Sequence, residues 1–293
     1  MHYRQIQPAA PLARFVECFW ILEGEGAPAA RPEAIFPDGS SELILNFGEP
    51  FRQVCPDGSR EPQPRSFLAG QLRGPLWVEP PARAGVFGVR FRPGGAPAFF
   101  PLPQHELAGR ILALDVLWAR SAAREVEEIN VDAGGGRVEA VERFLLAALR
   151  RGPPPDPVVE AAIESILSAG GALPVESLAA GIGISARHLE RRFRERVGLG
   201  AKLFSRIIRF QGVWQAIRRG DHDRWISIAL DGGYYDQAHF IREFKEFSGE
   251  TPSSYVSRSH ERKLAELFAR QNRPASRFFT IPRSRGAATV GRG

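Results

Sequence analysis

Two stretches in the C-terminal part of the chain carry arginine and glutamine side chains at matching positions. In the major groove of DNA, arginine can pair bidentately with guanine and glutamine with adenine. When Ser185 is aligned with Asp236, the stretches overlap at a shift of 51 residues, with these pairs: His188 with His239, Arg191 with Arg242, Phe193 with Phe244, and Gly198 with Gly249. This internal repeat predicts two copies of one DNA-reading unit.

Each copy has the pattern of a helix-turn-helix. A short apolar helix comes first, then a turn that contains glycine, and then a second helix that begins at a capping residue, Ser185 or Asp236. Leu178 corresponds to Ile228 at a shift of 50, so the turn of the second copy is one residue longer. In a helix-turn-helix the second helix is shaped to enter the major groove.

The candidate DNA contacts are the side chains that point away from the apolar face of each second helix. Leu189 and Phe193 lie four residues apart and therefore share the buried face. The candidate DNA contacts lie on the exposed side or at the start of these helices: Arg187, His188, Glu190, Arg191, Gln237, Ala238 and Arg242. We also expect the side chain of Ile241 to point away from the core. A single arginine-rich helix is more often a solvated surface, but two capped copies favour DNA binding.

Residues 201–219, between the copies, predict one long connector helix. Its apolar stripe consists of Leu203, Ile207, Phe210, Trp214 and Ile217. A rigid connector would fix the separation of the two recognition helices. Consecutive major grooves on one DNA face lie about 34 Å apart, so a single chain could read two adjacent turns without dimerising.

These features resemble the DNA-binding domain of the AraC/XylS family of bacterial transcription regulators. The resemblance rests on LAAGIGISARHLERRF (178–193), on IALDGGYYDQAHFIREFK (228–245) and on GETPSSY (249–255), and it covers about a third of the chain. It implies base contacts from the outward positions given above. It also implies RNA polymerase as a partner, and it leaves open whether the chain activates or represses.

The chain departs from the family pattern at three positions. Gly200 stands where proline is usual, Gly212 where alanine is usual, and Ala238 where a polar base reader is common. Glycine inside a helix costs up to ~1 kcal/mol relative to alanine. We therefore expect a connector that is less rigid than in other members of the family.

The fold class expected for the whole chain is multidomain, with a β-rich N-terminal domain that ends in helices and an all-α C-terminal domain. Residues 15–22, 42–47 and 85–91 predict strands, and apolar spacing from about 104 to 151 predicts helices. The proline run at 152–157 predicts a linker. The predicted domains are 1–151, a sensor or dimerisation domain; 158–257, the tandem helix-turn-helix domain; and 258–293, a basic and partly disordered tail.

Composition and charge limit the function further. Residues 1–157 have a net charge of −2 and residues 158–293 of +8, of which 258–293 contribute +7, and this asymmetry suggests a polyanion partner. No apolar run approaches the roughly 20 residues of a membrane span, and the start of the chain does not read as a secretory signal, so we expect a cytoplasmic protein. Cys18 and Cys55 cannot form a four-thiolate metal site, and nucleotide-binding and hydrolase motifs are missing, so we expect no metal, no cofactor and no enzyme activity.

The N-terminal domain resembles uncharacterised sensor-type domains that precede such DNA-binding units, on the basis of FPDG (36–39), LILNFG (43–48) and GVRFRPGG (88–95). The candidate ligand-binding residues are Trp20, whose ring could line a pocket, and Arg90 and Arg92, which could clamp a carboxylate or phosphate. A packed aromatic core and a solvated arginine pair are the alternatives. Two functions therefore stay open for this domain: sensing of a small-molecule effector, or protein interaction, including homodimerisation, without a ligand.

Overall fold

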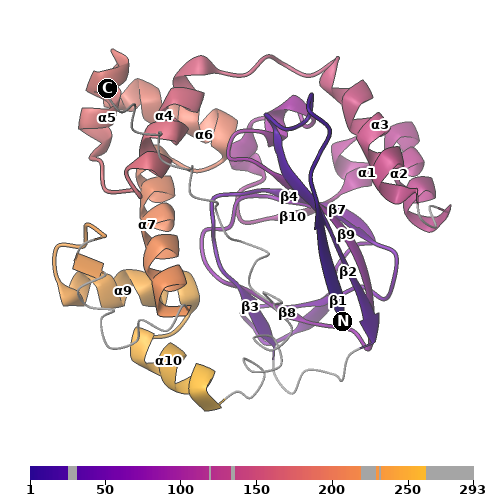
Figure 1. The fold of residues 1–293 in the computed structure, drawn as a ribbon, viewed down its shortest axis with the longest axis horizontal. Helices are drawn as coiled ribbons and strands as arrows, with labels where there is room; N and C mark the ends of the chain where they lie inside the picture. Colours follow the sequence, from indigo (N-terminus) through magenta and orange to yellow (C-terminus); the bar gives the residue numbers. More distant parts are fainter. Residues whose placement is uncertain (26–31, 119, 133–135, 219–228, 231, 262–293) are drawn as a thin grey trace, which may run out of the picture.

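The computed structural model describes residues 1–25, 32–118, 120–132, 136–218, 229–230 and 232–261 (Figure 1). A β-rich part is followed by helices, which confirms the predicted fold class. The strands are β1 His2–Ile6, β2 Val16–Glu25, β3 Glu33–Ile35, β4 Glu42–Asn46, β5 Arg52–Val54, β6 Arg60–Pro62, β7 Ser66–Ala69, β8 Leu76–Glu79, β9 Arg83–Phe91 and β10 Ile111–Ala113. The helices are η1 Ala96–Ala98, η2 Gln104–Glu106, α1 Leu114–Leu117, α2 Arg120–Asp132, α3 Arg137–Leu149, α4 Pro157–Ser168, α5 Val175–Ile182, α6 Ala186–Val197, α7 Ala201–Arg218, α9 Gln237–Ser248 and α10 Pro252–Glu261. The tail from residue 262 onward lies outside the described residues.

The strands form two antiparallel sheets, one in the order β1-β2-β9-β4-β7-β10 and one in the order β3-β8-β5-β6. Phe87, Val89 and Phe91 on β9 face a core that helices α1 to α3 help to close. The other face of the larger sheet is also buried, around Trp20 and Phe67. Because both faces of this sheet are covered, successive side chains along β9 point alternately into two buried cores, and neither set points to solvent.

The predicted helical run from residue 104 is wrong at Ile111. This residue lies in β10, which pairs with β7 at the edge of the larger sheet. Gly109 at a φ of +76° breaks the chain direction just before the strand. The buried Leu107 and Leu114 flank the strand, so their helix-like spacing arises from two separate elements and not from one helix face.

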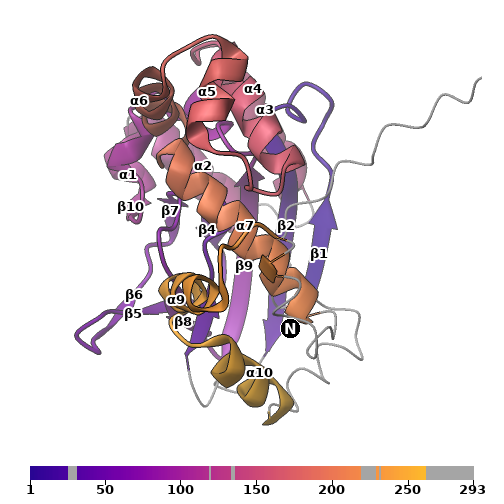
Figure 2. The ribbon, with the colours of Figure 1, turned by 90° about the vertical axis from the view of Figure 1, so that its left-hand side faces the viewer.

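The C-terminal helices form two small cores that share α7 (Figure 2). Phe204 and Ile208 of α7 pack in the core of α4, α5 and α6, while Ile207, Phe210 and Trp214 pack in the core of α9 and α10. The predicted connector helix is thus confirmed as one helix, about 27 Å long at 1.5 Å per residue. Helices α6 and α9 lie at its opposite ends.

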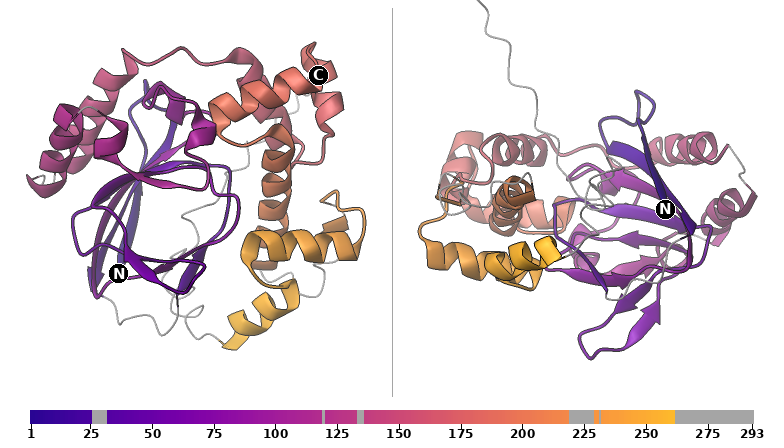
Figure 3. Two further views of the ribbon diagram at one scale, coloured as in Figure 1. Left: turned by 180° about the vertical axis from the view of Figure 1, so that it is seen from behind. Right: turned by 60° about the horizontal axis from the view of Figure 1, so that its bottom comes forward.

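The β-rich part also packs along α7 (Figure 3). Phe36, from the loop between β3 and β4, is 5% exposed and belongs to the core of α9 and α10. Helix α7 is therefore covered by three neighbours: two helical cores and this loop. An 18-residue helix that is buried on so many sides depends on tertiary contacts for its stability, not on its own helix propensity.

We expect the substitution Gly212→Ala to stabilise the chain by up to ~1 kcal/mol, because a Cβ at this exposed position in α7 meets nothing within 4 Å and alanine favours the helix. Urea unfolding of the full chain measures the change. Gly39→Ala is the contrasting variant: its φ is +84° and its Cβ would lie 2.6 Å from the Phe204 ring, so it must destabilise. Destabilisation by Gly212→Ala would show that close packing, and not helix propensity, governs this position.

Candidate DNA interface

The first helix-turn-helix copy consists of α5, a turn at Gly183 and α6. Gly183 ends α5 in the left-handed conformation at a φ of +81°, which a residue without a Cβ adopts without strain. The amide of Ile184 then donates to the carbonyl of Ala179 at 3.0 Å. Ser185 caps α6 by accepting a hydrogen bond from the amide of His188 at 3.2 Å, which confirms the predicted cap.

The second copy repeats these contacts. The amide of Tyr234 donates to the carbonyl of Ala229 at 3.2 Å, and Asp236 caps α9 by accepting from the amide of His239 at 2.6 Å. The one additional residue of this turn is Tyr235, whose side chain is 89% exposed. Ile228, which matches Leu178, lies outside the described residues.

The predicted division of each second helix into a buried and an exposed face is found in both copies. Leu189 and Phe193 on α6 are fully buried, as are Phe240 and Phe244 on α9. Five of the candidate contacts are exposed: Arg187, Arg191, Gln237, Ala238 and Arg242. Because these residues lie in the first two turns of their helices, they are available to DNA at the ends that recognition helices present to bases.

Glu190 does not belong to this exposed set. Its carboxylate accepts hydrogen bonds from the first amides of α7, from Ala201 at 3.1 Å and from Lys202 at 2.9 Å. These amides have no partner within α7, and a carboxylate there satisfies them and complements the helix dipole. Gly200 leaves room for this contact, because a Cβ at residue 200 would lie 2.3 Å from the Glu190 carboxylate. The prediction of Glu190 as a base reader is therefore corrected: Glu190 is a cap that joins α6 to α7.

Ile241 is also corrected, since its side chain is half-buried and packs against the core of α9 and α10. His188 is half-buried as well, beside the exposed arginines of α6. It lines a hollow of about 590 Å³ together with Ser185, Arg187, Glu190, Arg191, Arg194, Glu195 and, from η2, His105. The N-terminal part thus borders the recognition surface of α6, which the sequence pattern did not indicate.

Helix α9 is fixed to α7 by a buried carboxylate. Glu243 of α9 is 2% exposed and accepts a hydrogen bond from Nε of Arg206 at 2.7 Å. The carboxylate of Glu246 binds the same guanidinium. A guanidinium that bridges two carboxylates of the neighbouring helix holds the direction of α9, and with it the exposed side chains of its first turns.

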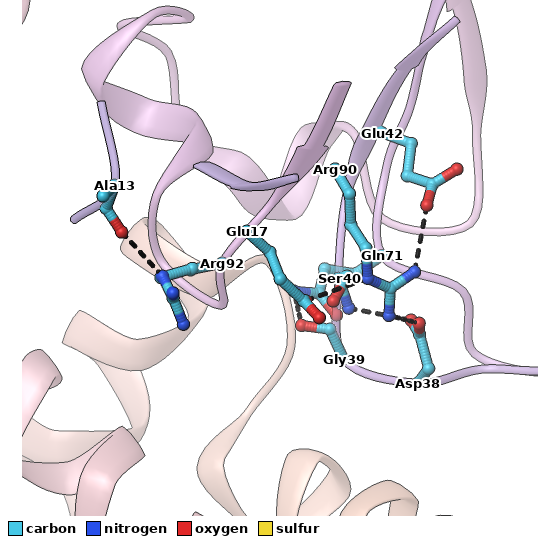
Figure 4. A network of polar contacts seen from close by, with 9 residues as sticks. All are labelled: Ala13, Glu17, Asp38, Gly39, Ser40, Glu42, Gln71, Arg90 and Arg92. Carbon is cyan, nitrogen blue, oxygen red and sulfur yellow. Dashed lines mark hydrogen bonds and ion pairs between the residues drawn. The ribbon is translucent and has the colours of Figure 1, made fainter. Parts of the chain in front are cut away.

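The two arginines predicted to bind a ligand, Arg90 and Arg92, do not converge on one site (Figure 4). Arg92 follows β9, is exposed, and donates from Nε to the carbonyl of Ala13 at 2.8 Å. Arg90 is 2% exposed and is already bound by three carboxylates, those of Glu17, Asp38 and Glu42. The predicted Arg90–Arg92 clamp is therefore not formed, because residue 90 points into the interior and residue 92 lies beyond the strand.

Trp20 is buried on the same interior face of the sheet, packed with Cys18, Ile44, Phe67 and Val86. Its ring lies over Gly88, where a Cβ would come within 2.0 Å of the indole. Trp20 accordingly has the packed-core environment that was the alternative to a pocket wall. Its part in ligand binding stays a prediction.

The network around Arg90 places more negative than positive groups in the interior. Burial raises the pKa of Glu42 to about 8, against the opposing effect of Arg90. Burial likewise raises the pKa of Asp38, although Arg90 and the amide of Ser40 oppose the shift. Burial alone would lower the pKa of Arg90, but the surrounding carboxylates outweigh it and raise that pKa. Arg90 therefore stays charged while Glu42 keeps its proton near neutrality.

Two absences concern only the described part of the chain. There, no three His, Cys, Asp or Glu side chains are grouped so that they could hold a metal ion. None of the helices described combines the length and the apolar character needed to cross a membrane.

Comparison with known proteins finds a family model that matches a segment of each part of the chain. Residues 4–113 match a domain of unknown function, DUF6597, and residues 178–258 match a helix-turn-helix domain. No curated protein matches the chain. Solved structures of ToxT from Vibrio cholerae are similar over most of the chain at very low identity. A P21 crystal form has a TM-score of 0.41 and 10% identity, covering 82% of this chain and 98% of that chain.

ToxT from strain O395 has a TM-score of 0.42 and 8% identity, covering 81% of this chain and 97% of that one. The same protein bound to (E)-4-(8-methylnaphthalen-1-yl)but-3-enoic acid has a TM-score of 0.43 and 10% identity, covering 88% and 99%. At this level of similarity the ligands of these proteins say nothing about the ligands of this chain.

We expect Glu190→Ala to lower the free energy of unfolding by about 1 kcal/mol, the usual cost of losing a helix cap, and to leave base preference unchanged. Unfolding curves and binding to a panel of single-base DNA variants measure the two effects. Glu195→Ala on the same helix is the matched control, because its carboxylate is half exposed and lies 3.7 Å from Arg191. A change in preference at one base position would restore Glu190 as a reader.

We expect stability to fall as the pH rises from about 4.5 to 8, because folded Glu42 keeps a proton that the unfolded chain releases. Glu42→Gln mimics the protonated acid and should flatten this slope, leaving the variant more stable than the parent at pH 8. Urea unfolding at pH 5, 6.5 and 8 measures the slope. The exposed Glu49→Gln is the control and should follow the parent. Parallel slopes for the parent and Glu42→Gln would mean that Glu42 is ionised throughout.

Proposed function

Because the chain is a transcription regulator of the AraC type, with a DUF6597 domain ahead of its helix-turn-helix domain, we propose that one copy of it reads two adjacent major grooves of DNA. The match to a helix-turn-helix domain assigns it to DNA-binding proteins and not to enzymes, as the sequence predicted. The two-groove reading goes further and rests on geometry.

The observation that carries this proposal is the arrangement of two capped recognition helices at opposite ends of α7. Each starts at a side-chain cap, each buries its aromatic side against its own core, and each exposes candidate readers within its first two turns. The connector is about 27 Å long, so helices packed at its two ends are within reach of successive major grooves, which lie roughly 34 Å apart on one DNA face.

The candidate contact residues on this surface fit different parts of the DNA. Arg187, Arg191 and Arg242 fit guanine, and Gln237 fits adenine. Ala238 offers only a methyl group, which fits the methyl of thymine. His188 lines the hollow beside the arginines and fits a phosphate contact rather than a base edge.

We also propose that the N-terminal domain senses a small molecule, with the interior around Arg90 as the region that responds. What supports this is the position of the network: Asp38, one of its carboxylates, belongs to the loop that contacts α7. The competing proposal is a protein-interaction or dimerisation domain without a ligand. Thermal stabilisation of the chain by a panel of metabolites separates the two, because a sensor gains stability from its ligand by mass action.

Two protein partners are part of this proposal. RNA polymerase is the partner that a promoter-bound regulator acts on. A second copy of the chain is not required for two-groove binding, since a single chain carries both recognition helices. Measuring mass on and off DNA decides whether a dimer forms.

We expect Arg242→Ala to cost 1–3 kcal/mol in binding the specific site, about the value of one bidentate arginine–guanine contact, and to relax preference at one or two base positions. Arg187→Ala, Arg191→Ala and Gln237→Ala should behave alike at other positions. Fluorescence anisotropy with specific and random DNA at fixed salt measures both effects. Arg124→Ala, on the exposed side of α2 in the N-terminal domain, is the control. Unchanged affinities for Arg242→Ala would refute the assignment of α9.

A further inference from the structure

The loop between β3 and β4 lies against the middle of the connector helix. The ring of Phe36 contacts those of Phe210 and Trp214 on α7, with centroids 6.0 and 5.4 Å apart. It also contacts Tyr255 of α10 at 6.1 Å. A side chain of the N-terminal domain thus completes the core of the second helix-turn-helix copy.

Two further contacts extend this docking along α7. Nε2 of Gln211 donates to the carbonyl of Pro37 at 2.6 Å, and both residues are buried. Gly39 lies so close to the Phe204 ring that a Cβ would come within 2.6 Å of it. The loop therefore covers α7 from Phe204 to Trp214, about 15 Å of helix.

This stretch contains Gly212, the residue that weakens α7. Gly212 is exposed and has open space where a side chain would stand, so its own contacts do not stiffen the helix. Gln211 and Trp214, on either side of it, are the residues that the loop holds. The contact bridges the turn of α7 with the lowest intrinsic helix propensity.

The loop is itself fixed within the N-terminal domain. Arg90 binds the carboxylate of Asp38, and the other oxygen of that carboxylate accepts from the amide of Ser40 at 2.9 Å. Nε2 of Gln71 donates to the carbonyl of Gly39 at 2.6 Å. All of these residues are buried, so the loop is a rigid extension of the sheet and not a flexible arm.

The N-terminal domain meets the C-terminal end of each recognition helix as well. Gly198, which ends α6, packs against Gln104, whose carbonyl would be 2.9 Å from a Cβ there. Gly249, which ends α9, packs against Trp77, whose ring would be 3.3 Å from a Cβ. These two contacts lie at the helix ends opposite to the exposed readers. On α6 the N-terminal part reaches further, because His105 of η2 lines the hollow that also contains Arg187 and Arg191.

We propose that the N-terminal domain splints the DNA-binding unit: docked on α7 through residues 36–39 and on both recognition helices through Gln104 and Trp77, it sets the half-site spacing that the chain accepts. This inference rests on the proposed function. It gives the DUF6597 domain a mechanical task whose partner surface is the connector helix of its own chain.

The test compares DNA duplexes in which the spacer between the two half-sites is native, one base pair longer or one base pair shorter. Each base pair moves the second half-site by about 3.4 Å along the axis and rotates it around the helix. The half-sites are first selected from a random pool with the parent protein. A duplex with one half-site and a random duplex complete the set.

Two variants weaken the contact between the loop at residues 36–39 and α7, one by a change in the loop and one by a change in the helix. Phe36→Ala removes the ring from the core of α9 and α10, and Gln211→Met removes the donor to Pro37 while keeping the side-chain length. Arg14→Ala is the control, because it breaks another contact between the two parts of the chain, the exposed ion pair with Glu160 on α4. Thermal melting shows which variants are folded, and Gln211→Met carries the test should Phe36→Ala unfold.

We expect the parent and Arg14→Ala to lose tenfold or more in affinity when the spacer changes, and the loosened variants to lose threefold or less. Affinity for a single half-site should stay within twofold in every folded variant. An unchanged spacing penalty in folded Gln211→Met and Phe36→Ala overturns the splint. So does tighter binding of every duplex, which would mean that the domain blocks the recognition helices. If the parent does not prefer a single half-site over random DNA, the proposed function fails, independently of the spacing result.

Discussion

The shared burial of one helix is the constraint on which this chain depends. Each helix-turn-helix copy is too small to close a core alone, and each uses a different side of α7, through Phe204 in one case and Phe210 in the other. Because a rigid helix cannot rotate one of these sides without the other, the two copies are held in one relative orientation. The loop at Phe36 adds a third buried side, so forming the DNA-binding unit and docking the N-terminal domain are parts of one packing event.

The charged interior around Arg90 is a second constraint on the structure. It affects α7 because one of its residues, Asp38, lies in the loop that packs against that helix. Burying the guanidinium of Arg90 with the carboxylates of Glu17 and Asp38 is costly unless the hydrogen bonds are well formed, and removing Arg90 would leave those buried acidic groups without a positive partner. That cost makes the position of Asp38 specific, and Asp38 lies in the loop that rests on α7. Any change of charge in this interior would therefore alter the loop that packs against the connector helix.

Local features of the structure were predictable from the sequence, and distant contacts were not. The caps Ser185 and Asp236 and the turn at Gly183 follow from side-chain chemistry within three or four residues. Glu190 was misassigned because its partners, the amides at the start of α7, become neighbours only after the chain turns. Arg90 follows an alternating pattern that usually means solvent, but Glu17 of β2, Asp38 of the loop before β4 and Glu42 of β4 surround it in the folded chain. The Phe36 contact joins residues more than 170 positions apart and leaves no periodic signal.

The double attachment of Glu190 limits how this regulator can acquire a new target sequence. The side chains at 187 and 191 are exposed and can be exchanged without touching the core. Glu190, which lies between them in the sequence, binds the first amides of α7. Base preference can therefore change through substitutions at residues 187 and 191, but not through substitutions at residue 190. A recognition helix transplanted from another regulator would have to bring a carboxylate at this place, or its own solution for the exposed amides, before any question of base preference arises.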